Sequence, residues 1–444
     1  MMFAWLISRA VKLRFVLLLV LVGLCVMAAM MIPRLNLDAF PDVTNIQVAI
    51  NTEAPGLAAE EVEQLITYPI EAVMYALPDV EEVRSISKTG LSGITVVFKE
   101  GTDIYFARQL VFERLQIAAG MIPEGVGVPA IGPNTSGLGQ VYQYLLIADP
   151  DSGFDSMALR SLNDYLIKLM LMPVDGITDV LSFGGYVRQY QVNLYPNRLL
   201  SYNLTQQDVV DALSRNNNNA GGWYMQRGPE QLVIRGTGWL SSDQQALEEL
   251  KQIPLKTAGS ALVTVGDVAQ IRIGSEIRQG AVTMTVKHPD GSISNRGEVV
   301  SGVVLKRMGA NTNATIEGIN ARLDLITKAL PEGVHFEPYY DQADLIKQAV
   351  DTVVKALLLA FMFIVIVLAL FLLSVRSTVL VLLSIPVSIG LALAMLSMLG
   401  ISANLMSLGG MAVAIGMLVD GSVVVVENIY QKLPKNSTET HKIP

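Results

Sequence analysis

Four long apolar segments constrain what this chain can fold into. A helix needs about 20 apolar residues to cross the hydrocarbon core of a bilayer. Three uncharged runs reach or approach this length, and a fourth carries a single charge, Asp420; the four runs span residues 15–32, 356–375, 379–399 and 405–426. We therefore predict four membrane-spanning helices. A cleaved secretory signal is the alternative for the first run, because basic residues precede it.

The basic residues that flank these runs predict the orientation of the chain. Cytoplasmic flanks of spans are enriched in lysine and arginine, and only short loops obey this rule. The flanking cations all fall on one side of four alternating spans, and they are Arg9, Lys12, Arg14, Arg376, Lys432 and Lys435. The N terminus is therefore expected in the cytoplasm, with residues 34–355 outside.

Composition excludes several classes of protein. The formal net charge of −8 argues against a nucleic-acid partner held by phosphate contacts. Cys25 is the single cysteine, and His288, His335 and His441 are too scattered for a histidine metal site. We find no nucleophile elbow, phosphate loop or zinc-protease motif, so the sequence gives no support to an enzyme and implies no cofactor.

The large outside segment has the pattern of an α+β fold. Strand and helix periodicities alternate over residues 45–118 in the order strand, helix, strand, strand, helix, with a closing strand expected near Val126, which suggests a split βαβ unit. A second unit begins near Val141, with a helix over 155–172 and a strand over 179–183. Residues 185–275 interrupt it as an insertion.

The insertion holds the asparagine run Asn216 to Asn219, followed by a β-rich stretch to Gly236. A turn that tolerates left-handed backbone is one interpretation of this run. A projecting hairpin that grips a neighbouring subunit is the other, and spacing alone does not favour it.

Asp420 is the feature that points to function. A carboxylate near the bilayer centre costs about 2.5–3.5 kcal/mol, so it should face protein or water. Ala412, Gly416 and Asp420 share one helix face, where small residues let another helix approach closely. Desolvation raises a carboxyl pKa, which suits a proton relay. A structural aspartate paired permanently with a lysine of another helix is the alternative.

Asp164 is a second candidate functional residue, as a ligand for a divalent cation. With Lys168 it has the i, i+4 spacing of a surface ion pair, which is the default interpretation. A carboxylate is also a ligand for a hard or borderline divalent cation, although one acidic residue does not make a site.

With these residues in place, the chain resembles the resistance-nodulation-division (RND) superfamily of proton-driven efflux pumps, in its heavy-metal branch of the cobalt-zinc-cadmium type. The matching stretches are Asp38-Ala-Phe-Pro-Asp-Val-Thr-Asn-Ile-Gln-Val, Thr67-Tyr-Pro-Ile-Glu, Phe98 to Leu110, Ser402 to Gly410, and Val419-Asp-Gly through Val426-Glu-Asn. In that branch a single aspartate followed by glycine or alanine marks metal pumps, whereas drug pumps carry two adjacent aspartates. Gly421 therefore argues for metal.

The resemblance implies a fold, a domain plan and partners. The fold is a membrane α-helical bundle, with four spans here, and a large α+β periplasmic porter region of ferredoxin-like βαβ subdomains. The parts are the cytoplasmic N terminus with helix 1 (1–33), a first porter subdomain (34–135), a second (136–184 and 276–340), a docking insertion (185–275), helices 2–4 (341–433) and an unmatched tail (434–444). It further implies a bacterial inner-membrane homotrimer that works with a periplasmic membrane-fusion adaptor and an outer-membrane channel.

Two departures from the family pattern stand out. Gly137-Leu-Gly-Gln140 replaces a Gly-Leu-Gly-Glu pattern, which leaves Asp164 as the remaining candidate ligand for a transported divalent cation such as zinc, cobalt or cadmium. Family members are also about twice this length, so the chain is expected to be an N-terminal part, whose missing half could be a separate chain. A multidrug pump fragment and a truncated, non-transporting membrane module that assembles with a full pump are the alternatives.

Overall fold

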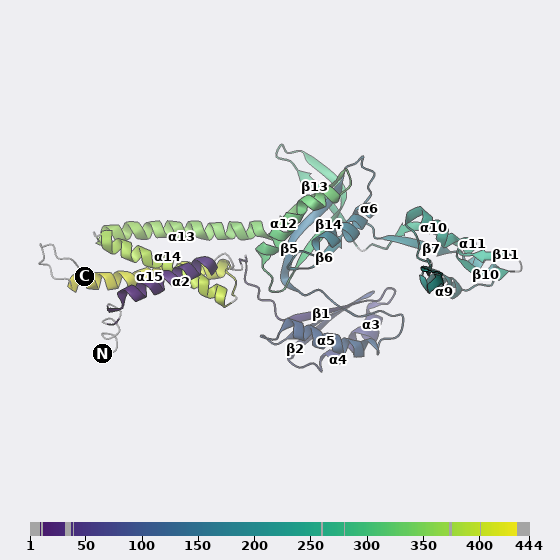
Figure 1. Cartoon of the computed structure of the whole chain (residues 1–444), viewed down its shortest axis with the longest axis horizontal. Coiled ribbons are helices and arrows are strands. Elements are labelled where there is room, and N and C mark those ends of the chain that lie inside the picture. Colours follow the sequence, from purple (N-terminus) through teal and green to yellow (C-terminus); the bar gives the residue numbers. More distant parts are fainter. Residues whose placement is uncertain are drawn as a thin grey trace.

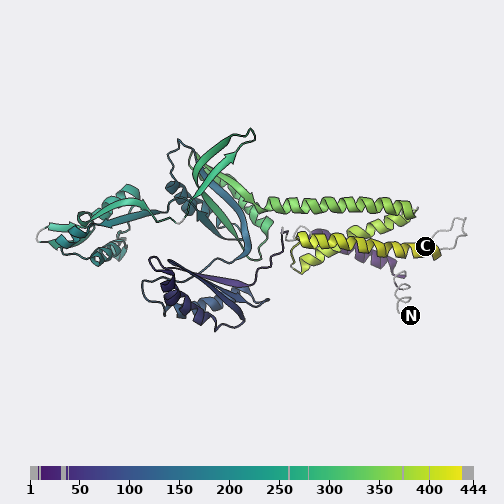
Figure 2. The same cartoon turned by 180° about the vertical axis from the view of Figure 1, so that it is seen from behind.

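The computed structural model describes residues 9, 12–31, 37–38, 40–258, 261–278, 280–372, 375–399 and 401–432. The chain is elongated, with three regions in a row (Figures 1 and 2). Long helices gather at one end, two α+β units lie in the middle, and an insertion forms the other end. The predicted tail, 434–444, falls outside the described residues.

Among the described residues, four helices are long and apolar enough to cross a membrane, as predicted. They are α2 (Arg14–Met31), α13 (Gln342–Leu372), α14 (Val375–Met398) and α15 (Leu405–Lys432). Helix α14 contacts the other three, and its Val381 and Ile385 are buried against Ile415 and Val419 of α15. Most other apolar side chains of these helices are exposed, which suits a lipid environment rather than water.

The first α+β unit is a four-stranded antiparallel sheet with helices on one face. Its elements are β1 (Gln47–Glu53), the continuous helix α3–η2–α4 (Ala59–Val62, Glu63–Thr67, Tyr68–Met74), β2 (Val80–Lys88), β3 (Leu91–Phe98), α5 (Ile104–Ala119) and β4 (Ala130–Ile131). The strand order β2-β3-β1-β4 confirms the predicted split βαβ arrangement. The closing strand, however, lies at 130–131 rather than near Val126, which belongs to the connection before it.

Helical periodicity explains how this unit closes its core. Val62, Ile66, Ile70 and Met74 recur every four residues and are fully buried against the sheet. Helix α5 begins at a defined position because the side chain of Asp103 accepts a 2.8 Å hydrogen bond from the Phe106 amide.

The second unit repeats the same topology. Its elements are β5 (Thr135–Ala148), the helix α6–η3–α7 (Ser156–Leu162, Asn163–Ile167, Lys168–Leu171), β6 (Ile177–Phe183), β13 (Val282–Lys287), β14 (Ile293–Arg307), α12 (Thr312–Ala329) and β15 (Val334–Asp341). The order β6-β14-β5-β15 matches that of the first sheet, and β13 adds a hairpin to the start of β14. Helix α13 follows β15 directly, so this unit is continuous with a membrane helix (Figure 1). The predicted fold class is confirmed.

The insertion leaves the second unit on a two-stranded stem. Strand β7 (Arg188–Leu194) pairs antiparallel with β12 (Ala269–Ser275) along its whole length. Between them lie α8 (Pro196–Ser201), α9 (Gln206–Asn216), β8 (Ala220–Arg227), β9 (Glu230–Gly236), α10 (Asp243–Lys251), β10 (Pro254–Ala258), β11 (Ala261–Thr264) and α11 (Val265–Val268).

Strands β8 and β9 form a hairpin whose residues are all exposed. The asparagine run stabilises its base: the side-chain oxygen of Asn219 accepts hydrogen bonds from the amides of Gly238 and Trp239. Trp223 and Val233 on this hairpin are 77% and 78% exposed, so the hairpin presents apolar side chains to its surroundings. The hairpin weighed from the sequence is thus present, but the left-handed turn is not, because none of Asn216 to Asn219 has a positive φ and Asn216 is the last residue of α9.

Candidate functional site

Asp420 lies on α15, where its side chain is exposed. The helix begins at Leu405, so Asp420 lies about 22 Å along it and about 9 Å before Val426, the last residue of the apolar run. Within the described residues, no hydrogen bond or ion pair reaches this carboxylate. Asp420 therefore sits within the apolar run of α15, on a helix face that the described helices leave open.

The predicted small-residue face of α15 borders an apolar groove. Gly416 lies about one turn and Ala412 about two turns before Asp420, and both are exposed. Together with apolar residues of α13 and α14, among them Phe361 and Pro386, they line this groove. A Cβ added at Gly416 or Gly421 would meet no atom within 4 Å. The groove can therefore admit another helix close to the carboxylate.

Asp164 lies in η3, and its two carboxylate oxygens already have partners. Arg160 Nε donates to Oδ2 at 2.8 Å, and the hydroxyl of Ser182 in β6 donates to Oδ1. The predicted pair with Lys168 is wrong: Lys168 Nζ lies 2.7 Å from Asp179 Oδ1 instead. Arg160 and Lys168 each lie four residues from Asp164, so spacing alone does not identify which of them pairs with it. Lys168 pairs elsewhere because β6 presents a second aspartate, Asp179.

Asp164 belongs to a buried hydrogen-bond network beneath the second sheet. Tyr144 donates to Asn163 Oδ1 at 2.8 Å, and Asn163 Nδ2 donates to Ser182 Oγ at 2.7 Å. Burial, and then the charge of Asp164, raise the pKa of Tyr144, so its hydroxyl remains a donor. The sequence gave no signal for this network except a polar Asn163 at an otherwise apolar helix position.

Gln140 lies on β5 but has different neighbours from Asp164. Gln143 Nε2 donates to Gln140 Oε1 at 3.2 Å, and Tyr339 donates to Gln143 Oε1 at 2.6 Å. Among the described residues, no hydrogen bond joins Gln140 to Asp164. Nor do three histidine, cysteine or acidic side chains come together there as a metal cluster.

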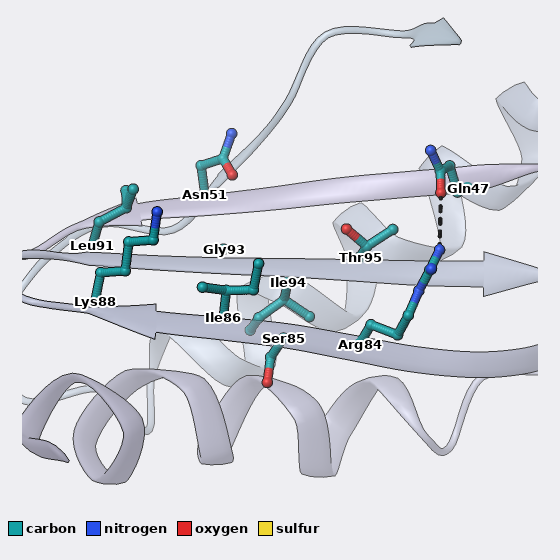
Figure 3. A pocket seen from close by; sticks show the side chains of 10 residues that line it. All are labelled: Gln47, Asn51, Arg84, Ser85, Ile86, Lys88, Leu91, Gly93, Ile94 and Thr95. Carbon is teal, nitrogen blue, oxygen red and sulfur yellow. Dashed lines mark hydrogen bonds between the residues drawn. The ribbon is translucent and has the colours of Figure 1, made fainter. Parts of the chain in front are cut away.

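The first sheet carries a shallow pocket on its strands β1, β2 and β3 (Figure 3). Arg84 and Lys88 are its charged lining residues, and Arg84 reaches over to donate to Gln47 Oε1 at 3.4 Å. No carboxylate lines it. Two cations repel a third, so this pocket is a poor site for a metal ion.

Known proteins of similar sequence identify the family of this chain. The sequence profile of the AcrB/AcrD/AcrF family matches residues 6–443. The cation efflux system protein CzcA of Alcaligenes sp. (strain CT14) and the cobalt-zinc-cadmium resistance protein CzcA of Cupriavidus metallidurans are each 38% identical over the whole chain. The cation efflux system protein CusA of Escherichia coli (strain K12) is 35% identical over 97% of the chain.

The chain spans 40% of the length of each of these relatives. A crystal structure of a heavy metal efflux pump superposes with a TM-score of 0.82 at 32% identity, covering 96% of this chain and 41% of that one. The resemblance predicted from the motifs is thereby confirmed, and the chain belongs to the AcrB/AcrD/AcrF family.

Proposed function

We propose that the chain is the N-terminal portion of a proton-driven antiporter that exports divalent heavy-metal cations across the cell envelope. The observation that carries this proposal is Asp420, a lone carboxylate at membrane depth on an open face of α15. The names of the relatives, which refer to cation efflux and to cobalt, zinc and cadmium resistance, support cations as the cargo.

Asp420 would serve as the proton carrier. A carboxyl group in an apolar environment is neutral when protonated and costly when charged, so its protonation state changes how well α15 fits its surroundings. The runs that precede it, at residues 15–32, 356–375 and 379–399, hold no basic residue to neutralise it. We infer that a helix from outside the described chain packs into the groove beside Gly416 and covers Asp420.

Asp164 is the residue of the second unit that we propose as a ligand for the transported cation. Because Arg160 and Ser182 use both of its oxygens, cation binding requires the Arg160 bridge to open. The exposed amide Gln140 lies on the same unit and contributes at most a neutral oxygen.

We propose that the chain resides in a bacterial inner membrane with its N terminus in the cytoplasm, and that it works in a homotrimer. The exposed hairpin β8–β9, with Trp223 and Val233, would provide the grip on the next protomer, because burial of these side chains offsets the cost of exposing them to water. A periplasmic adaptor and an outer-membrane channel would complete the pathway.

Two alternatives are distinguishable. A multidrug pump is disfavoured by Gly421, which stands where the resemblance places a second aspartate in drug pumps. A non-transporting module that assembles with a full pump fits the fact that the chain spans 40% of its relatives' length. Such a module would not raise metal tolerance above that of the strain without native pumps.

The test is a chimera in which residues 1–432 replace the matching part of the Cupriavidus metallidurans CzcA protein, expressed in a strain without native pumps. We expect the chimera to restore zinc and cobalt tolerance, Asp420→Asn to abolish it, and Asp420→Glu to retain part of it. The amide keeps the shape of the side chain but cannot exchange a proton. Each proton that crosses the membrane supplies about 2.3 kcal/mol of free energy per 100 mV of potential, so Asp420→Asn should remove the driving force. Full tolerance in Asp420→Asn would exclude the relay.

A further inference from the structure

A short segment between α2 and β1 contacts both the membrane helices and the second unit. We call its described residues, 37–38 and 40–46, the strap. At the membrane end, Leu37 forms a parallel bridge with Ala403, and the amide of Asp38 donates to the Ala403 carbonyl at 3.2 Å. Ala403 is fully buried and lies just before α15. The strap thus holds the loop from which the Asp420 helix starts.

The first turn of α15 is rigidly joined to that loop. Asn404 Oδ1 accepts a 3.0 Å hydrogen bond from the Ser407 amide, and the amide of Asn404 donates to Ser407 Oγ at 2.9 Å. This reciprocal pair has the logic of a helix cap, which fixes the backbone entering the helix. A displacement of the start of α15 must therefore carry Ala403, and the strap residues bonded to it, along.

The carboxylate of Asp38 fastens the strap to the second unit. Thr312 Oγ1 at the start of α12 donates to Asp38 Oδ1 at 2.7 Å, across 274 positions of sequence. Lys306 Nζ donates to Thr312 Oγ1 at 2.9 Å and lies 3.9 Å from Asp38 Oδ1. The Lys306 side chain is 9% exposed. Since a buried ammonium needs an opposite charge nearby, this link is more than a surface contact.

Further along, the strap also contacts strand β5. The amide of Gly137 donates to Thr44 Oγ1 at 3.2 Å. Gly137 opens the stretch that ends at Gln140, and Gln140 pairs with Leu305, the neighbour of Lys306 on β14. The strap therefore connects the start of α15 with strands β5 and β14 of the second unit, and β5 carries Gln140.

We propose that Asp38 is a positioning residue through which the strap makes the outer end of α15 and the second unit move together. Its role in transport rests on the proposed function; the mechanical link does not. A shift of α15 is transmitted to α12 and β14 because each step is a direct contact. Ala403, which precedes Asn404, accepts a hydrogen bond from the Asp38 amide, and the Asp38 carboxylate accepts one from Thr312. Protonation of Asp420 would in this way alter the porter unit.

The test measures the distance between spin labels at two exposed positions, Met406→Cys on α15 and Leu325→Cys on α12, in the full chain carrying Cys25→Ser, embedded in lipid nanodiscs. We expect Asp38→Ala to roughly double the width of the distance distribution, as loss of a direct link should. Thr312→Val should broaden it similarly, and the double variant should be no broader than either single one. Asp38→Asn, which still accepts from Thr312, should fall between.

Asp175→Ala is the matched control. Asp175 pairs with Arg307, the residue after Lys306, at 3.2 Å, but its side chain is 99% exposed and does not touch the strap. This variant should leave the distribution as in the parent chain.

An unchanged distribution in Asp38→Ala, whether or not the melting temperature falls, would overturn the proposal, because a purely structural role lowers stability without loosening α15 from α12. If Asp38→Ala does not fold, Asp38→Asn and Thr312→Val carry the same test. The measurement needs no transport, so failure of the Asp420 experiment leaves it interpretable.

Discussion

The hydroxyl of Tyr144 lies 2.8 Å from Oδ1 of Asn163, and both side chains are completely enclosed in the second unit. Tyr144→Phe would remove the donor and leave a buried amide oxygen without it. We expect a loss of about 1–3 kcal/mol in the free energy of unfolding. Denaturant unfolding in detergent measures it.

Tyr165→Phe is the control for that substitution, because Tyr165 lies on η3 near Asn163 and is 76% exposed. Removal of its hydroxyl should change stability by less than about 0.5 kcal/mol. Equal effects of the two substitutions would show that the buried network contributes nothing.

Arg160→Gln should free Asp164 for a cation. The substitution removes the 2.8 Å hydrogen bond from Nε, so zinc no longer competes with a guanidinium, and calorimetry should show tighter zinc binding. The free energy of unfolding should fall by about 1.5–3 kcal/mol, the usual contribution of a hydrogen bond to a charged group. Lys168→Gln breaks the 2.7 Å pair with Asp179 and is the control. If both variants bind zinc alike, Asp164 is not the ligand.

Gln140→Glu should strengthen divalent cation binding to the second unit, because a borderline cation gains a charged oxygen ligand. Gln143 already donates to this position and would hold the new carboxylate in place. Calorimetry with zinc compares it with Gln270→Glu, which adds the same charge to an exposed position of the insertion. A result in which Gln270→Glu binds as well as Gln140→Glu argues for a diffuse charge effect.

Asp42 should make the strap region sensitive to acid. Burial tends to raise its pKa, but the polar groups of Ser136 and Thr44, with the charge of Lys306, lower it overall. A lowered folded-state pKa contributes stability above the unfolded value of about 3.9, and this is lost as pH falls through the folded pKa. Asp42→Asn should therefore flatten the decline of the melting temperature in that acid range.

The pKa of Asp341 is shifted in the opposite direction from that of Asp42. Burial raises its pKa, the Ala343 amide lowers it and the neighbouring Asp344 raises it, with a net rise. Its contribution is present below about pH 3.9 and is lost as pH rises through the folded pKa. Asp341→Asn should therefore reduce a loss of stability on the alkaline side of that value; a shift in the same direction as for Asp42→Asn would contradict both assignments.

Expressed by itself, the 444-residue chain should insert with its N terminus inside and confer no metal tolerance. Insertion requires only the four apolar runs and their flanking charges. Transport also requires a cover for Asp420, which the described helices do not supply. Thiol labelling of a cysteine placed near Arg9 checks the orientation, and growth against an empty-vector control checks tolerance. Tolerance above that control would point to a working oligomer of such chains.

Features repeated along the sequence were predictable, and contacts between distant segments were not. The membrane helices follow from run length alone, and the order of strands and helices in the first unit follows from periodicity. Spacing does not distinguish Arg160 from Lys168 as the ion-pair partner of Asp164, since both lie one helical turn away from it. The choice depends on where β6 presents Asp179, which is a tertiary fact.

For the same reason, the sequence does not mark Asp38 as a linking residue. Its partners Thr312 and Lys306 follow it by more than 260 positions, and nothing in their local patterns marks them as neighbours. Gln140 and Asp164 were grouped because a family pattern named both, yet the hydrogen bonds of Gln140 lead to Gln143 and Tyr339. Side-chain direction on a bulged strand cannot be deduced from alternation.

The paired stem β7–β12 has a consequence for how such a chain can change over evolution. Because Arg188 and Ser275 face each other, everything between them begins and ends at one point on the second unit. A module attached in this way can lengthen, shorten or be exchanged for another, since a short turn would rejoin the cut ends. The exposed hairpin β8–β9 is thereby free to diverge while the sheet that carries the stem keeps its register.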